Sequence, residues 1–295
     1  MPYKTPDQIA VTAVAAGVKK ANLPVANALV GGFLAGAYIA FAGLLAVDVT
    51  AGLRPELWGG LITLFNGAVF SMGLVLVIIA GAELLTGNMA LVPMAALQRK
   101  VTLGRMSANF ALVLVANLLG SLFVAYVLAV HTGIIGTPDS EAGSAAAATF
   151  ARLDTIATGK AITETHLEIF LRAIGCNWLV CLAVWMAMAA EEVAGKILAI
   201  FFPITAFVAL GFDHVVANMF FLPAAHWAGV EGITWGRILE NWLYAGVGNL
   251  IGGGVFVGGA YWFSYLRGSG PADAPTATSD ASGTAGARGT GGPVH

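Results

Sequence analysis

Charged residues are scarce in this chain of 295 residues. Only 10% are Asp, Glu, Lys or Arg, whereas 58% are hydrophobic, and the mean hydropathy is +0.82. A water-soluble domain of this composition would expose large apolar patches, which monomeric soluble proteins rarely do. The shortage of charge therefore excludes an ordinary soluble domain and predicts an integral membrane protein.

Cysteine is scarce as well, and basic residues are not in excess. The two cysteines, Cys176 and Cys181, fall on one predicted helix. Their spacing turns that helix by roughly 500°, so the sulfurs point in different directions and no disulfide is expected. No group of cysteine and histidine has the spacing of metal ligands, and we expect no metal or other cofactor. A net charge of -2 and an isoelectric point near 6.2 give no indication of nucleic-acid binding.

What the chain has instead is long apolar runs. A helix needs about 20 apolar residues to cross the hydrocarbon core of a bilayer. Six stretches meet this requirement, at residues 26–48, 59–97, 107–130, 169–190, 196–228 and 240–266. They predict an all-α integral membrane protein with six transmembrane helices. The second and fifth stretches are too long for one straight span each.

The basic residues are distributed unevenly between the two sides of this six-span arrangement. Nine of the Lys and Arg residues fall on the side of both termini, and five fall on the other side. The positive-inside rule therefore predicts a multi-pass protein of the inner (plasma) membrane with cytoplasmic N- and C-termini. Its apolar faces would contact membrane lipid.

The two ends of the chain differ from the predicted six-helix transmembrane domain, residues 26–267. In residues 1–25, Thr5-Pro6-Asp7 is typical of a helix start. This amphipathic helix would lie at the cytoplasmic surface on an apolar side formed by Ile9, Val11, Val14 and Val18. Residues 268–295 are rich in Gly, Ala, Ser, Thr and Pro and predict a disordered cytoplasmic tail, because such a composition cannot bury a core.

One unusual segment occurs twice. The sequence GAELLTGNMALVPMAA at residues 81–96 matches GFDHVVANMFFLPAAH at residues 211–226. Both copies place a glycine, an acid and an asparagine in an otherwise apolar run, and these residues are Gly81, Glu83 and Asn88 in the first copy and Gly211, Asp213 and Asn218 in the second. They are unfavourable inside a continuous membrane helix, so the pattern predicts a break in the second and in the fifth helix.

The repetition extends into the helices that follow. Residues 101–121 align with residues 233–253, and the shared positions are Thr102/Thr234, Gly104/Gly236, Arg105/Arg237, Asn109/Asn241, Asn117/Asn249 and Gly120/Gly252. Three spans thus repeat as three, over about 26–130 and 169–267. Because the number of spans is odd, the second copy would lie upside down relative to the first. This inverted 3+3 repeat would place the binding region near the membrane midplane.

A break at membrane depth has chemical consequences. Non-helical backbone is tolerated there only where it is buried in protein or lines a polar cavity. The free N–H groups and the positive dipole end of the following half-helix favour an anion. We expect Glu83 and Asp213 to accept backbone N–H bonds that stabilise the breaks, the alternative being a contact with substrate.

Four segments resemble the formate/nitrite transporter family, namely GAELLTGN, CNWLVCLAVWMA, AGKILAIFFPITAFVALGFDHVVANMFFLP and GNLIGGG. The resemblance covers nearly the whole chain up to the tail. It implies an aquaporin-like six-helix protomer in a homopentamer, with one pore in each protomer. It also implies passage of small monovalent anions or their acids, formate first, with nitrite, hydrosulfide and lactate as alternatives.

The two copies of the repeat differ at one informative position, where Leu84 in the first copy corresponds to His214 in the second. In the family that the chain resembles, this histidine is the central pore residue, and imidazole exchanges a proton near neutral pH. Asn177 is the expected hydrogen-bond partner of His214. Thr86 matches the family's loop threonine and offers a hydroxyl to the pore. The alternative for Asn177 and Thr86 is a contact between packed helices.

Further pore positions follow from the resemblance. It assigns four residues to apolar constrictions on either side of the histidine, namely Phe70, Leu74, Leu84 and Phe207, and core or lipid-facing packing is the alternative. Leu85 stands where formate channels usually have phenylalanine. The smaller leucine would widen that ring, so this position does not decide between formate and nitrite as the substrate. Lys160 resembles the vestibule lysine that attracts anions, the alternative being a solvated loop lysine.

These residues predict pH-dependent, proton-linked transport. An anion that passes an apolar ring must lose its charge, either as its neutral acid or paired with imidazolium. An aquaporin would carry Asn-Pro-Ala at both breaks, where this chain has Gly87-Asn88-Met89 and Ala217-Asn218-Met219. A membrane-embedded enzyme using Glu83, Asp213 and His214 is a distant alternative, and it lacks a nucleophile motif, metal cluster or cofactor fingerprint. We therefore expect no enzymatic activity.

Overall fold

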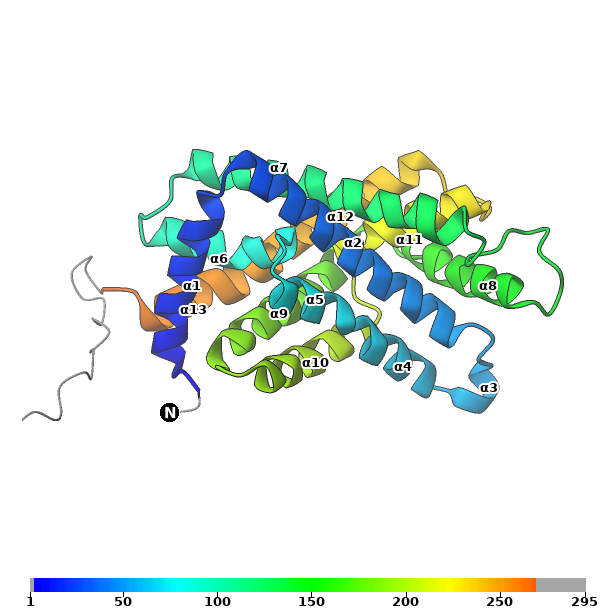
Figure 1. Cartoon of the computed structure of the whole chain (residues 1–295), viewed down its shortest axis with the longest axis horizontal. Coiled ribbons are helices and arrows are strands. Elements are labelled where there is room, and N and C mark those ends of the chain that lie inside the picture. The colour runs from blue at the N-terminus through cyan, green and yellow to red at the C-terminus, as the bar shows by residue number, and fades with distance from the viewer. Residues whose placement is uncertain (1–2, 269–295) are drawn as a thin grey trace, which may run out of the picture.

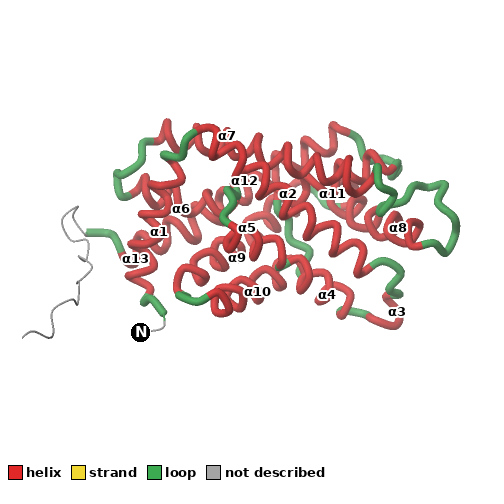
Figure 2. The backbone as a smooth tube through the Cα atoms, viewed as in Figure 1, coloured by secondary structure: helices red, strands yellow, loops and turns green. Residues whose placement is uncertain are grey.

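The computed structural model describes residues 3–268, so most of the predicted tail at 268–295 lies outside the described residues. Within the described range the secondary structure is helical apart from one isolated β-bridge between Tyr3 and Ala190 (Figures 1 and 2). The α-helices are α1 (Pro6–Ala21), α2 (Val25–Thr50), α3 (Pro55–Trp58), α4 (Leu61–Phe70), α5 (Met72–Ala80), α6 (Leu85–Leu97), α7 (Leu103–Phe123), α8 (Ala145–Thr158), α9 (His166–Ala189), α10 (Val193–Ala209), α11 (Val215–Ala228), α12 (Trp235–Gly253) and α13 (Ala260–Tyr265). Three π-helical stretches, η1 (Val124–Val130), η2 (Gly159–Thr163) and η3 (Gly254–Gly259), join or extend them.

Several of these helices are long enough to cross a membrane. Within the described residues, five helical stretches have the necessary length and apolar composition, at Val25–Thr50, Leu61–Ala80, Leu103–Val130, His166–Ala189 and Trp235–Tyr265. Three further apolar helices, α6, α10 and α11, are shorter. Six spans were predicted, and two of these stretches are divided: residues 59–97 into α4, α5 and α6, and residues 196–228 into α10 and α11. Residues 61–80 of the second stretch remain long enough to span a membrane, whereas neither part of the fifth is long enough alone. The architecture is that of a multi-pass membrane protein.

The helices are interrupted at the two repeated segments. Gly81 follows α5 with a φ angle of +82°, and Gly211 follows α10 with a φ angle of +72°. A side chain would strain this left-handed backbone, so glycine lets both helices end without strain. The chain then runs without helix to Leu85, where α6 begins, and to Val215, where α11 begins. Each break therefore produces a short half-helix whose first turn lies inside the protein.

Two helix pairs pack closely around these breaks. α2 contacts α7 at Gly36, where an added Cβ would lie 2.0 Å from the carbonyl oxygen of Asn117. α9 contacts α12 at Gly252, where an added Cβ would lie 2.3 Å from the carbonyl oxygen of Ile174. Small residues allow such close backbone contact between membrane helices. These contacts carry α7 and α12 alongside the half-helices α6 and α11 (Figure 1).

The N-terminal helix α1 packs against α6. Its buried residues are Ile9, Ala10, Ala13, Val14 and Gly17. Val11 was predicted to belong to the apolar side, but 37% of it is exposed. The helix turns the face with Ile9 and Val14 towards α6, and the contact of Val11 with a membrane surface stays a prediction. The protein itself, and not only a membrane surface, thus covers this apolar face.

Candidate functional site

A buried histidine and a buried threonine meet where the two half-helices begin. His214 is the N-cap residue of α11, and Thr86 lies in the first turn of α6. The Thr86 Oγ1 atom lies 2.9 Å from His214 Nε2, and the Ala217 N–H donates to His214 Nδ1 at 3.1 Å. Since Nδ1 accepts a hydrogen bond, the neutral ring carries its proton on Nε2 and donates it to Thr86. The Thr86 hydroxyl proton is then available to another acceptor.

Asn177, on α9, supports this pair through the backbone. Its Nδ2 atom donates to the carbonyl oxygen of Thr86 at 3.2 Å and to that of Asn249 at 2.7 Å. The predicted hydrogen bond from Asn177 to the His214 ring does not occur among the described residues. The side chain is fully buried and joins the first turn of α6 to α12 through these two carbonyl groups. Asn177 therefore positions Thr86, the partner of the histidine.

An ionic network closes the first break. Lys20 Nζ lies 2.9 Å from Glu83 Oε2, and Asn88 donates to the same carboxylate oxygen at 3.3 Å. Asn88 also donates to Asn109 Oδ1 at 3.0 Å, and Asn109 donates to the carbonyl of Lys20 at 3.0 Å. The network joins α1, the break, α6 and α7 in one ring. Glu83 thus accepts from side chains, and the predicted role as an acceptor of backbone N–H bonds was wrong.

The second break carries the same network. Lys160 Nζ lies 2.8 Å from Asp213 Oδ1, and Asn218 donates to that oxygen at 2.9 Å. Asn218 also donates to Asn241 Oδ1 at 2.8 Å, and Asn241 donates to the carbonyl of Lys160 at 3.0 Å. The prediction of backbone N–H bonds was therefore wrong for Asp213 too. Lys20 is the counterpart of Lys160 at the other break.

Two further asparagines bind the first turn of each half-helix. Asn117 Oδ1 accepts the Leu85 N–H at 2.9 Å, and Asn249 Oδ1 accepts the Val215 N–H at 2.8 Å. Each of these asparagines also donates to the carbonyl of the acidic residue in its break, at 2.8 Å. The first N–H group of each half-helix, which we expected to attract an anion, is therefore occupied by protein.

The sequence alone predicted no role in the site for Lys20 or for four asparagines, namely Asn109, Asn117, Asn241 and Asn249. The repeat alignment contained the signal for the asparagines, since Asn109/Asn241 and Asn117/Asn249 are shared positions. Lys20 lies outside both aligned segments, and no motif marked it. It is recognisable only because the fold brings α1 against the first break.

Apolar side chains close the space beside the histidine. The rings of Phe70 and Phe207 meet edge to face, 5.9 Å apart, and Phe207 also lies 5.9 Å from the ring of His214. The space between these residues measures about 10 Å³, and its other lining residues are Ile39, Leu74, Leu84, Val180 and Ile204. A space of this size holds at most one water molecule. Leu85 is buried but does not line it.

A larger cavity begins on the far side of Phe70 and Phe207. It measures about 230 Å³ and also reaches His214. Its charged lining residues are Arg152, Lys160, Glu164 and Arg172. Arg172 Nη1 donates to Glu164 Oε1. Burial, and then the negative charge of Asp213, raise the pKa of Glu164 to about 7.

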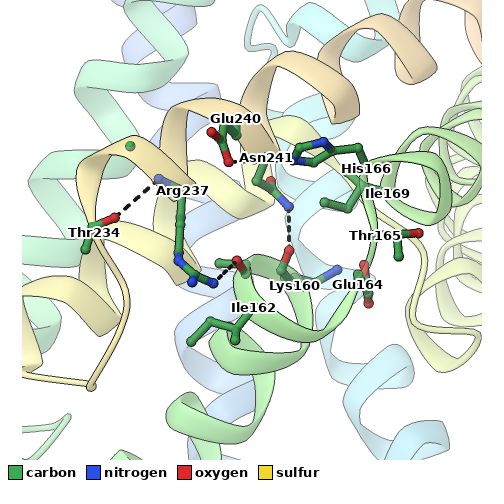
Figure 3. A pocket seen from close by; sticks show the side chains of 12 residues that line it. Lys160, Ile162, Glu164, Thr165, His166, Ile169, Thr234, Arg237, Glu240 and Asn241 are labelled. Atoms are coloured by element: carbon green, nitrogen blue, oxygen red, sulfur yellow. Dashed lines mark hydrogen bonds and ion pairs between the residues drawn. The ribbon is translucent and has the colours of Figure 1, made fainter.

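Lys160 and Glu164 also line a second, more open cavity of about 660 Å³ (Figure 3). There Asn241 donates to the Lys160 carbonyl, and Arg237 Nη1 donates to the Ala161 carbonyl at 3.3 Å. Lys160 therefore lies in the wall between two cavities, and its amino group is held by Asp213.

The two cysteines form no disulfide with each other, and one of them contacts Thr86. Both are free and buried, and Cys181 Sγ donates to the carbonyl of Thr86 at 3.3 Å. Among the described residues no group of three or more His, Cys, Asp or Glu side chains is arranged to hold a metal ion. The site therefore consists of hydrogen-bonding side chains, paired ions and an apolar constriction.

Comparisons of the sequence and of the structure with known proteins find transporters and channels. The profile of the formate/nitrite transporter family matches residues 7–263. Over 267 residues the chain is 48% identical to an uncharacterized transporter, YrhG, of Bacillus subtilis (strain 168), covering 90% of this chain and 96% of that protein. It is 44% identical over 271 residues to a probable formate transporter of Methanothermobacter thermautotrophicus, covering 90% and 98%. A solved pentameric formate channel with formate bound is similar with a TM-score of 0.70 and 28% identity, covering 82% and 98%.

Proposed function

Because this chain belongs to the formate/nitrite transporter family, we propose that it carries small monovalent anions, or their weak acids, across the inner membrane, with formate as the main substrate. A probable formate transporter and a formate-bound channel among its relatives support formate. Nitrite, hydrosulfide and lactate are the alternatives. The observation that carries the proposal is the buried Thr86–His214 pair between a cationic cavity and an apolar constriction.

The constriction supports transport of a neutral species. The cavity of about 230 Å³ has three cationic residues and one carboxylic acid in its lining, which favours entry of an anion. The space beyond Phe70 and Phe207 is almost entirely apolar, and an ion is expensive there. The anion therefore takes up a proton before it crosses, and transport is linked to protons.

The geometry of His214 favours one of the two routes to neutrality. An imidazolium ring would carry a proton on Nδ1 and would then face the Ala217 N–H, so that two donors opposed each other. A neutral ring keeps this hydrogen bond and donates from Nε2 to Thr86. The Thr86 hydroxyl then donates to the carboxylate, which takes its proton from water on the side of entry. One proton crosses with each anion and returns to water on the other side.

The matched networks support the proposed topology. Lys20 and Glu83 at one break and Lys160 and Asp213 at the other have the same partners, as expected for two related halves. We propose an inverted repeat of three plus three helices, in which α4 to α6 form the second helix and α10 with α11 form the fifth. The uneven distribution of basic residues supports cytoplasmic termini.

Uptake of labelled formate by proteoliposomes tests the function. Wild-type protein should take up formate faster as the external pH falls from about 8 to about 5, because more substrate is protonated at the pore. The substitution His214→Asn should lower the uptake rate strongly at every pH, because it removes the ring nitrogen that donates to the Thr86 hydroxyl. His131→Asn is the matched control, since His131 is exposed outside the cavities. An uptake rate in His214→Asn equal to that of the wild type contradicts the proposed mechanism.

Substrate choice is measured separately. Unlabelled nitrite, hydrosulfide and lactate compete with labelled formate in the same vesicles. Formate itself should compete best. Stronger competition by nitrite would assign the chain to nitrite transport within the same family.

A further inference from the structure

Arg152 lines the cavity of about 230 Å³ and belongs to neither of the two matched networks. It lies on α8 and lines the cavity together with Lys160 and His214. Its Nε atom donates to the hydroxyl of Thr50 at 2.8 Å, which is an uncharged partner. The side chain is partly buried. Under the proposed function, an anion that enters this cavity meets this cation.

The other cations of this cavity each contact a carboxyl group. Lys160 is paired with Asp213, and Arg172 with Glu164. In residues 3–268 no salt bridge involves Arg152. Arg152 is therefore a cation of the cavity lining that no carboxyl group of the described residues contacts.

The chemistry of the side chain defines what it can hold. A guanidinium group has five N–H donors in a planar fork. One of them is directed at Thr50, and the described residues provide no acceptor for the two terminal nitrogens. Two parallel N–H groups match the two oxygens of a planar anion such as a carboxylate or nitrite. An anion with one acceptor atom gains only the charge.

The first break has no counterpart of Arg152. Counting back the same number of positions from Lys20 and from Lys160 reaches Thr12 on α1 and Arg152 on α8. Thr12 is neutral, and its hydroxyl donates to the carbonyl of Gln8 at 2.9 Å and accepts from Lys4 Nζ at 3.4 Å. The two breaks therefore share the lysine–carboxylate pair, and the arginine lies on the side of the second break.

We propose that Arg152 is an anion-binding residue at this entrance, which holds a planar oxyanion through two N–H groups before it reaches Thr86 and His214. The proposal rests on the proposed anion transport and adds a binding step at one of the two mouths. It makes Arg152, and not the paired Lys160, the first residue to bind substrate on this side. It also gives planar oxyanions an advantage over hydrosulfide there.

Initial rates of formate uptake in membrane vesicles of both orientations test this. In Arg152→Gln the half-saturating formate concentration should rise about tenfold in one orientation only, because a lost charge-assisted hydrogen-bonded pair corresponds to roughly that factor. In Arg152→Lys the half-saturating concentration should rise less, and the preference for formate over hydrosulfide should fall. Arg54→Gln, which removes an exposed arginine outside the cavity, should change neither value.

A purely structural role is distinguished by Thr50→Val. This substitution removes the hydroxyl that Arg152 contacts and leaves the guanidinium charge. Its half-saturating concentration should stay within twofold of wild type, and an increase like that of Arg152→Gln overturns the inference. An unchanged value in Arg152→Gln overturns it as well. Wild-type vesicles without formate flux would instead contradict the proposed function itself.

Discussion

A buried imidazole that accepts a backbone N–H has one ring nitrogen left for other contacts. In His214 this nitrogen is Nε2, and it points to the hydroxyl of Thr86. The hydroxyl can pass a hydrogen bond forward because it accepts one from the ring and keeps its own proton. The pair is therefore arranged to offer a single hydrogen-bond donor beside the apolar constriction.

Glu164 should make the stability of the protein depend on pH. Burial and Asp213 raise its pKa from 4.5 to about 7, and the cations that face it are Lys160 and Arg172. The folded protein therefore holds this proton more tightly than the unfolded chain does. The resulting stabilisation is complete below pH 4.5 and is lost as the pH rises through about 7.

Thermal unfolding of detergent-solubilised protein checks this prediction. From about pH 5 to about pH 8 the melting temperature of the wild type should fall relative to that of Glu164→Gln, because the amide has no proton to lose. Glu240→Gln serves as the control, since its carboxylate is 60% exposed and should add little to the pH dependence. A constant difference between wild type and Glu164→Gln contradicts the assigned protonation of Glu164.

The half-helices α6 and α11 form a second level of organisation. Each begins after a glycine, binds its first N–H to an asparagine of a neighbouring helix, and places an asparagine against the acid of its break. These contacts satisfy polar groups that a continuous helix would have satisfied by itself. The breaks are therefore stable structures that the fold supports from several elements.

The glycines at the breaks should tolerate no side chain without loss of stability. Gly81→Ala and Gly211→Ala should each lower the free energy of unfolding by about 1 kcal/mol, because alanine is strained at positive φ. Space is not the reason, since an added Cβ at either position meets nothing within 4 Å. Chemical unfolding in mixed micelles measures the difference.

Gly104 provides the matched control. It lies in the first turn of α7, has no positive φ, and also leaves an added Cβ without a contact within 4 Å. Gly104→Ala should be neutral or stabilising, by up to about 1 kcal/mol, because alanine favours helix. Equal destabilisation at all three glycines would contradict the role of backbone strain at the breaks.

At the scale of the whole molecule, the two halves have matched networks and differ at one central position. The halves have the same lysine, acid and asparagines, whereas Leu84 in one half stands where His214 stands in the other. The entrances differ too, because Arg152, Glu164 and Arg172 line the described cavity on one side. We therefore expect the shared residues to support the breaks and the differing residues to decide the chemistry of transport.

The assembly is the prediction that belongs to this scale. Many large apolar side chains are exposed on the protomer, among them Phe202, Leu103 and Leu243, which lipid or neighbouring protomers would cover. The similarity to a pentameric channel favours five copies. Native mass spectrometry of the detergent-released protein should therefore give the mass of five chains of 30.2 kDa. A stable monomer or dimer would contradict this.

Much of the fold and part of the site could be predicted from the order of the residues. Apolar length predicted membrane helices, and the repeated glycine, acid and asparagine marked where α5 and α10 end, because these residues oppose a continuous helix. The exchange of leucine for histidine between the copies marked His214. These features depend on local backbone chemistry, which a sequence specifies directly.

Contacts between distant segments were beyond such reasoning. Only the tertiary structure decided that Lys20 pairs with Glu83, that Asn177 binds carbonyl groups instead of the imidazole, and that Arg152 shares a cavity with His214. Each of these depends on how helices far apart in the chain pack and on which polar groups the breaks leave unsatisfied. The sequence by itself determined where the helices break, and packing decided which side chains meet there, because a hydrogen bond requires distance and direction that residue order does not contain.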